Sequence, residues 1–152
     1  MSLIQPAECP LNFLSNSPEE TFNLGKRIAL SLSNGSVLTL DGVLGCGKTS
    51  LAKGIASALG ITENLTSPTY TIINEYESEN IPAFYHIDAY RLKDEKEFEE
   101  IGGDEILNSR GICLIEWSLN IIKSIPENAI KVFISITGSE SREISVFGLD
   151  SI

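Results

Sequence analysis

Residues 42–49 read Gly-Val-Leu-Gly-Cys-Gly-Lys-Thr and fit the phosphate-binding pattern G-x-x-x-x-G-K-[ST] at every specified position. Glycines let successive backbone N–H groups turn toward one anion, and a helix that follows adds the positive end of its dipole. Lys48 is predicted to reach the β- and γ-phosphates of a nucleotide, and the Thr49 hydroxyl to hold Mg²⁺. The alternative, a glycine turn without a ligand, has no use for this Lys-Thr pair. The loop therefore predicts a nucleotide-binding protein.

Two carboxylates are candidates for the chemistry that a phosphate loop alone does not perform. Glu116 directly follows the apolar run Ile112–Ile115, where an acid is typical of residues that orient Mg²⁺ or its water shell. A surface glutamate at the end of a strand is the alternative. Asp88 ends an extended run and could orient the attacking water or bind the metal shell. Both carboxylates remain candidates for the residue that orients the water.

Further polar residues accompany these two. His86 falls on the same face as Asp88 if the run is extended, and a hydrogen-bonded, partly buried histidine is favoured over a catalytic one. Tyr90 is predicted to be half buried, and Arg91 could pair with a nearby acid. The segment 66–69, Thr-Ser-Pro-Thr, lies where a segment that senses the γ-phosphate would sit, with an ordinary hydroxyl-stabilised turn as the alternative.

These residues need a strand before the loop and a helix after it. The apolar, β-prone run 36–40 predicts a buried strand, and Leu51, Ile55 and Leu59 predict a helix that ends at Gly60. An earlier helix is predicted to begin at Ser17, because a capping serine, a proline and a glutamate three residues later mark a helix start. It is predicted to end at residues 34–35, Asn-Gly.

The remaining patterns complete the expected architecture. Strands are predicted at 69–76, 83–87 and 112–115, short helices at 94–101 and 104–108, and a closing hairpin at 129–137 and 142–147. Alternating strands and helices favour an α/β fold: a three-layer domain of the P-loop NTPase kind, with a mixed sheet and a C-terminal hairpin. The 152 residues are predicted to form this one domain.

Composition narrows the class of protein. No apolar run approaches membrane-spanning length, and three scattered cysteines without a C-x-x-C pair favour a reducing, cytoplasmic location. The formal charge is −10, which repels polyphosphate backbones. We therefore expect contact with RNA only indirectly, through a basic partner.

Together, the loop 42–49, residues 67–70, the H-x-D-x-Y-R run 86–91 and the pair Glu116-Trp117 closely resemble the bacterial TsaE (YjeE) family, small ATPases needed to make the threonylcarbamoyl modification of adenosine in tRNA. The resemblance runs from about Ser17 to Phe147. It implies ATP and Mg²⁺ as cofactors and a TsaB–TsaD complex as the partner. Hydrolysis would drive turnover of that complex rather than the carbamoyl transfer itself.

The resemblance also carries over to single positions. It implies metal binding by Thr49 and Glu116, and a catalytic role for Asp88, Glu116 and Lys48. Val43 stands where the family commonly has an acid, and Cys46 replaces the usual alanine, which would place a thiol sensitive to oxidation beside the phosphates. Nucleotide contacts are implied for Gly45, Cys46, Gly47, Lys48, Thr49 and Ser50, with Thr21 and Arg142 near the nucleotide.

Two other functions remain open at this stage. A small-molecule kinase usually carries a basic lid, whereas the insertion at 94–108 is acidic. A nucleotide-switched binding module would use the same loop without needing hydrolysis. A GTPase is disfavoured because the chain has no N-K-x-D motif to read guanine.

Overall fold

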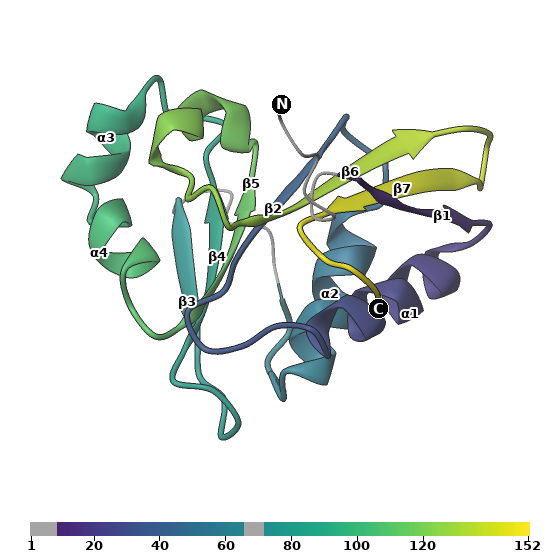
Figure 1. Ribbon diagram of the computed structural model, residues 1–152, viewed down its shortest axis with the longest axis horizontal. Coiled ribbons are helices and arrows are strands. Elements are labelled where there is room, and N and C mark those ends of the chain that lie inside the picture. Colours follow the sequence, from purple (N-terminus) through teal and green to yellow (C-terminus); the bar gives the residue numbers. More distant parts are fainter. Residues whose placement is uncertain (1–8, 66–71) are drawn as a thin grey trace, which may run out of the picture.

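The structure, a computed structural model, describes residues 9–65 and 72–152. These residues form a seven-stranded sheet in the order β1-β7-β6-β2-β5-β4-β3 (Figure 1). The strands are β1 (Leu11–Ser15), β2 (Val37–Gly42), β3 (Ile73–Tyr76), β4 (Phe84–Asp88), β5 (Ile112–Glu116), β6 (Ile130–Ile136) and β7 (Arg142–Phe147). The helices are α1 (Pro18–Ala29), α2 (Lys48–Ala58), α3 (Glu95–Glu100), α4 (Gly103–Leu107) and the 3₁₀ segment η2 (Ser118–Ser124).

The centre of the sheet is parallel. Strand β2 pairs in parallel with both β5 and β6, and β5 pairs in parallel with β4. Antiparallel pairs complete the two edges of the sheet. At one edge β3 pairs with β4, and at the other β7 pairs with β6 and β1 pairs with β7. Since parallel strands end at the same edge of a sheet, the residues that follow β2, β4 and β5 are brought together there.

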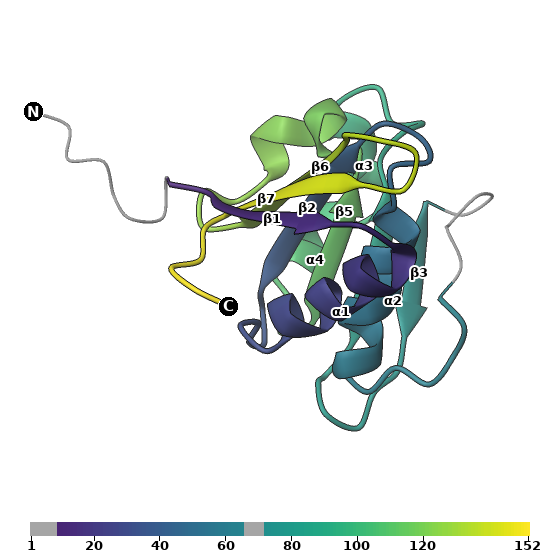
Figure 2. The ribbon, with the colours of Figure 1, turned by 90° about the vertical axis from the view of Figure 1, so that its right-hand side faces the viewer.

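Helices cover both faces of the sheet, which makes the predicted three layers. One core lies under α1 and α2 and includes Leu38, Leu40 and Leu114. The other lies under the short helices and includes Phe98, Ile115 and Ile121. Figure 1 shows α3 and α4 on one side of the strands and α1 and α2 on the other, and Figure 2 shows the latter two side by side.

Helices α1 and α2 cross with their backbones in contact. A Cβ atom built on Gly54 would lie 2.0 Å from the carbonyl oxygen of Phe22, and one on Gly25 would lie 2.3 Å from that of Leu51. Both distances are shorter than any real Cβ contact, so each position accepts only glycine. The helix that begins at the phosphate loop is thereby held directly against the first helix.

Most elements lie where the sequence predicts them. Ser17 caps α1 by accepting from the backbone N–H of Glu20 at 3.1 Å, and the helix ends at Ala29, before the predicted stop. Gly60 follows α2 with φ of 85°, as expected of a residue that ends a helix. Strand β2 runs on to Gly42, and β3 is described from Ile73, because the predicted start at 69–71 lies outside the described residues.

The sequence patterns miss two elements. Strand β1 pairs antiparallel with β7 at the edge of the sheet, and the apolar–polar alternation expected of such a strand is broken by an exposed Leu14 and a buried Ser15. Segment η2 follows a left-handed residue, Trp117, that propensity does not predict. One burial prediction is wrong. Tyr90 is 60% exposed, because its ring lies against the ring of Trp117 at 4.9 Å between centroids rather than in a core.

Candidate functional site

The glycine loop joins β2 to α2 and has the backbone conformation that an anion cradle needs. Gly45 and Gly47 have φ of 77° and 107°, values that favour glycine. Gly47 precedes the first residue of α2, so the unpaired N–H groups of that helix begin at the loop. The strand, loop and helix predicted around residues 42–49 are thus present.

Lys48 lies against the loop itself. Its side chain is largely buried, with the residue 8% exposed, and Nζ donates a hydrogen bond to the carbonyl oxygen of Gly42. The same Nζ atom lies 4.5 Å from the centroid of the Trp117 ring. An ammonium group has three N–H donors, and the bond to Gly42 uses one of them. The lysine is therefore fixed beside the loop with donors left for an anion.

Asp88 and Glu116 are neighbours at the ends of adjacent strands. They are register partners in the parallel pair of β4 with β5, and Leu40 of β2 is aligned with Glu116 on the other side. The predicted pair of carboxylates is thus brought together beside the end of the strand that leads into the loop. Thr49, the second residue of α2, is exposed.

Glu116 is held by a buried histidine. His86 Nε2 lies 2.8 Å from Glu116 Oε2, and the two residues are 2% and 7% exposed. This agrees with the prediction that His86 is a hydrogen-bonded histidine. Its Nδ1 atom is buried and has no hydrogen-bond partner among the described residues. The contact fixes the orientation of the Glu116 carboxylate.

The pKa of Asp88 is raised above its usual value. The main cause is burial, and the charge of Glu116 adds to it. A hydrogen bond from the Tyr90 N–H at 2.9 Å, together with His86 and Lys48, acts in the opposite direction without cancelling the rise. The ionised carboxylate is therefore destabilised in the protein without ligands, and a nearby cation would relieve that cost.

The residues beside the loop can supply oxygen ligands of the kind that Mg²⁺ takes. No group of three or more His, Cys, Asp or Glu side chains that could enclose a metal occurs in the described part of the chain. Mg²⁺ typically binds through one or two carboxylates, with water and substrate phosphates completing its octahedral shell. Glu116, Asp88 and the Thr49 hydroxyl offer that kind of oxygen set next to a phosphate loop.

Arg142 also contacts the glycine loop, through two of its backbone carbonyls. At the start of β7, its Nε donates to the carbonyl oxygen of Cys46 at 2.9 Å and its Nη2 to that of Gly45 at 3.4 Å. A trans peptide directs its carbonyl and N–H to opposite sides, so the bond to Cys46 turns the Gly47 N–H away from the guanidinium. The structure thus places Arg142, which was predicted near the nucleotide, on the carbonyl side of the loop.

Replacing Arg142 with alanine is expected to weaken ATP binding by about tenfold, because the loop must then be ordered by the nucleotide itself. Isothermal titration calorimetry with Mg²⁺ measures the change. Arg110, an exposed arginine outside the site, provides a matched control in Arg110→Ala. Equal affinities of Arg142→Ala and Arg110→Ala would contradict the positioning role of Arg142.

A hollow of about 280 Å³ adjoins the loop. Thr21 of α1 and Ser50 of α2, both predicted near the nucleotide, line it together with Gly47 and Arg142. Thr21 is 2% exposed, and its hydroxyl is 2.7 Å from that of Ser15. Ser17 and Pro18 at the start of α1, with Ser139 and Glu140 of the β6–β7 turn, complete its lining.

Cys46 lies beneath the loop rather than at its surface. The residue is fully buried, and a Cβ atom on Gly42 would lie 2.6 Å from its Sγ. Burial raises the pKa of the thiol. A buried, protonated thiol is a poor nucleophile, which disfavours the expected sensitivity to oxidation.

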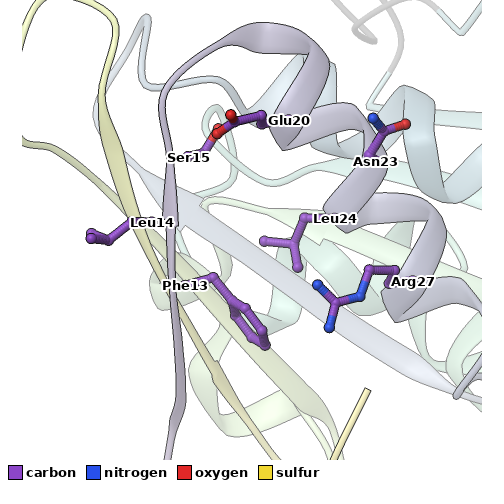
Figure 3. A pocket seen from close by; sticks show the side chains of 7 residues that line it. All are labelled: Phe13, Leu14, Ser15, Glu20, Asn23, Leu24 and Arg27. Atoms are coloured by element: carbon purple, nitrogen blue, oxygen red, sulfur yellow. The ribbon is translucent and has the colours of Figure 1, made fainter.

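A second hollow, of about 250 Å³, lies between β1 and α1 (Figure 3). Phe13 and Leu24 point into it beside Arg27, whereas Leu14 points away. The guanidinium carbon of Arg27 is 5.4 Å from the Phe13 ring centroid, and Nη2 donates to the carbonyl oxygen of Ile152 at 3.3 Å. None of the residues that line this hollow belongs to the glycine loop, so it does not extend the candidate site.

Sequence reasoning missed two residues at the site, Asp41 and Ser118. Asp41 is the last residue before the loop motif, and its carboxylate accepts from both the N–H and the hydroxyl of Ser118. An acid near the end of a largely apolar strand was a signal in the sequence, but its partner lies 77 residues away. The segment 66–69, predicted to sense the γ-phosphate, lies outside the described residues.

Comparisons with known proteins agree on one family. A family model described as "Threonylcarbamoyl adenosine biosynthesis protein TsaE" matches residues 15–144. A tRNA threonylcarbamoyladenosine biosynthesis protein TsaE from Bacillus subtilis is 42% identical over 135 residues, covering 89% of this chain and 84% of that protein. One from Treponema pallidum is 36% identical over 133 residues, covering 88% and 97%.

A solved structure is similar to this chain in both fold and sequence. The crystal structure of Bacillus subtilis YdiB is similar to this chain with a TM-score of 0.76 and 36% identity. The match covers 90% of this chain and 84% of that one. The fold described above is therefore shared with a protein whose structure has been solved.

Proposed function

The chain belongs to the TsaE family of threonylcarbamoyladenosine biosynthesis, and on that premise we propose that it binds ATP with Mg²⁺ and hydrolyses it to ADP and phosphate. The observation that carries the proposal is the position of Lys48, whose ammonium group is fixed beside a glycine loop at the start of α2. A buried cation next to unpaired N–H groups is suited to a polyphosphate chain. The loop residues 45–50 would hold the phosphates, and the hollow lined by Thr21 would receive another part of the nucleotide.

The two carboxylates, Glu116 and Asp88, would have different roles in hydrolysis. Thr49 and Glu116 would hold Mg²⁺, and His86 keeps the Glu116 carboxylate oriented. When bound, Mg²⁺ neutralises charge on the phosphates and helps to align the reacting groups. Asp88 would orient the attacking water by accepting a hydrogen bond from it.

A partner is expected to complete the site. Of the four arginines, Arg142 already donates to loop carbonyls, and Arg27 stacks on Phe13. The other two, Arg91 and Arg110, are exposed. We therefore propose slow hydrolysis by the isolated protein and faster turnover in a TsaB–TsaD complex. The net charge of −10 supports contact with tRNA only through such partners.

Membrane insertion plays no part in the proposal. Within the residues that the structure describes, no helix is both long enough and apolar enough to span a bilayer.

Calorimetric titration of the folded protein with ATP, in the presence of Mg²⁺, tests the proposal directly. We expect a saturable 1:1 heat with ATP and ADP and little or none with GTP, and slow release of phosphate that a TsaB–TsaD complex accelerates. Absence of adenine nucleotide binding by folded protein would overturn the proposal. Fast hydrolysis that partners leave unchanged would overturn the part that assigns a role to the complex.

A further inference from the structure

Asp41 is a buried carboxylate to which the proposed chemistry gives no role. It lies near the end of β2, is 9% exposed, and immediately precedes the loop residue Gly42. Its Oδ1 accepts from the backbone N–H of Ser118 at 2.9 Å, and its Oδ2 accepts from the Ser118 hydroxyl at 2.6 Å. Both oxygens are thus used to hold one residue, which lies just after the end of β5. Charge-assisted hydrogen bonds of this kind are strong where solvent is excluded.

The residue before Ser118 has an unusual backbone. Trp117 has φ of 57° and ψ of 43°, and it is the one non-glycine residue with positive φ among those described. Side chains other than glycine, asparagine and aspartate rarely adopt this conformation, so the surrounding structure must maintain it. The two bonds from Asp41 fix the residue that directly follows and thereby hold the turn.

That turn determines where the indole ring lies. The centroid of the ring is 4.5 Å from Lys48 Nζ. The ring also packs against the ring of Tyr90, with 4.9 Å between the two centroids. Lys48 Nζ also donates to Gly42, the neighbour of Asp41 in sequence. The ammonium group therefore lies between the Gly42 carbonyl and the Trp117 ring. Asp41 is bonded covalently to Gly42, and it holds Trp117 indirectly, through its hydrogen bonds with Ser118.

We propose that Asp41 is a positioning residue for the phosphate-binding lysine. By clamping Ser118 it keeps Trp117 in the left-handed conformation, and the indole then holds the Lys48 ammonium in place before the nucleotide arrives. Fixing a flexible lysine in advance lowers the conformational cost of binding. The inference deepens the proposed function and rests on it, because it concerns affinity for the phosphates of ATP.

A double-mutant cycle tests whether Asp41 acts through Trp117. ATP affinity in the presence of Mg²⁺ is measured by calorimetry for wild type, Asp41→Ala, Trp117→Ala and the double variant. We expect each single change to weaken binding by about tenfold, and the double variant to bind no more weakly than Trp117→Ala alone. A purely structural role would give independent losses, so a further tenfold loss in the double variant would overturn the inference. So would wild-type affinity in Asp41→Ala.

Two further variants separate positioning from general destabilisation. Asp41→Asn keeps an acceptor for the Ser118 N–H and is expected to stay within about threefold of wild type. Thr39→Val, at another buried polar position of the same strand, provides the matched control and is expected to leave ATP affinity unchanged. A tenfold loss in Thr39→Val would show that affinity follows strand stability, and would overturn the inference.

Trp117 is the single tryptophan of the chain, so its fluorescence measures the mobility of the indole at this turn independently of ATP binding. In nucleotide-free Asp41→Ala, the fluorescence anisotropy of Trp117 is expected to fall, because the indole loses its fixed place; an unchanged anisotropy would count against the inference. If Asp41→Ala does not fold, Ser118→Ala, which removes one of the two bonds, enters the same cycle with an expected loss of a few fold. If the wild-type protein binds no ATP, the proposed function is overturned rather than the role of Asp41 alone.

Discussion

Replacing Lys48 with alanine is expected to lower ATP affinity by about 100-fold or more while the protein remains folded. Two charge-assisted hydrogen bonds to phosphate, each contributing about 1.5–3 kcal/mol, account for a loss of this size. The fold should survive because the buried ammonium group contributes one hydrogen bond to Gly42 and a ring contact, and its removal also relieves the cost of burying a charge. Calorimetry with Mg²⁺ measures the affinity, and circular dichroism with thermal melting measures the fold.

The same helix offers a control for this change. Lys53 is exposed and lies on α2 beyond the first turn, so Lys53→Ala alters the charge of the helix without altering the site. We expect Lys53→Ala to bind ATP as wild type does. An unfolded Lys48→Ala would mean that the lysine is chiefly a structural residue, and an unchanged affinity would mean that it does not reach the phosphates.

Replacing Asp88 with asparagine is expected to reduce the hydrolysis rate by about 100-fold or more with little change in ATP affinity, because the acceptor for the attacking water is lost. Release of phosphate under single-turnover conditions measures the rate, and calorimetry measures the affinity. Asp150→Asn changes an exposed carboxylate near the C-terminus and serves as the control. A rate for Asp88→Asn equal to that control would remove Asp88 from the proposed mechanism.

The same variant should be more stable than wild type at neutral pH. The pKa of Asp88 is raised in the folded protein, so the folded state binds this proton more tightly than the unfolded state does. The stability that Asp88 contributes is therefore present at low pH and is lost as pH rises through its folded pKa. Asparagine cannot ionise, so the melting temperature of Asp88→Asn should exceed that of wild type at pH 7, with a difference that shrinks as pH falls toward 4.

Asp88→Asn also separates an ATPase from a nucleotide-switched binding module. An ATPase whose turnover matters to the cell should lose tRNA modification in this variant, even though ATP still binds. Mass spectrometry of tRNA nucleosides from cells that carry only the variant gives the result. Normal levels of threonylcarbamoyladenosine, with hydrolysis lost, would favour the switch.

The parts of the site that were predictable are those that local sequence encodes. The loop from Gly42 to Thr49 and the helix start at Ser17 depend on neighbouring residues, and the structure confirms the elements around both. Glu116 could be named as a candidate because it ends a continuous apolar strand, a pattern visible without any partner. The family itself was also predictable, since its motifs are short and occur in a fixed order.

The parts that were missed depend on contacts between distant segments. No periodicity in the sequence pairs Asp41 with Ser118, or directs Arg142 to the carbonyls of the loop, because those contacts form only when the sheet is assembled. The left-handed conformation of Trp117 opposes the intrinsic preference of the residue and is imposed from outside. Strand β1 contributes too few alternating residues to stand out before β7 is beside it.

The crossing of α1 and α2 has a consequence for how this protein can vary. Main chain meets main chain at Gly25 and Gly54, so the separation of the two helices does not depend on the size of any packed side chain. Exchanges among the aliphatic residues nearby can alter the density of the interior, but they leave the axis-to-axis distance as it is. The distance between Thr21 on α1 and the glycine loop at the start of α2 is therefore determined by the contact between the two backbones.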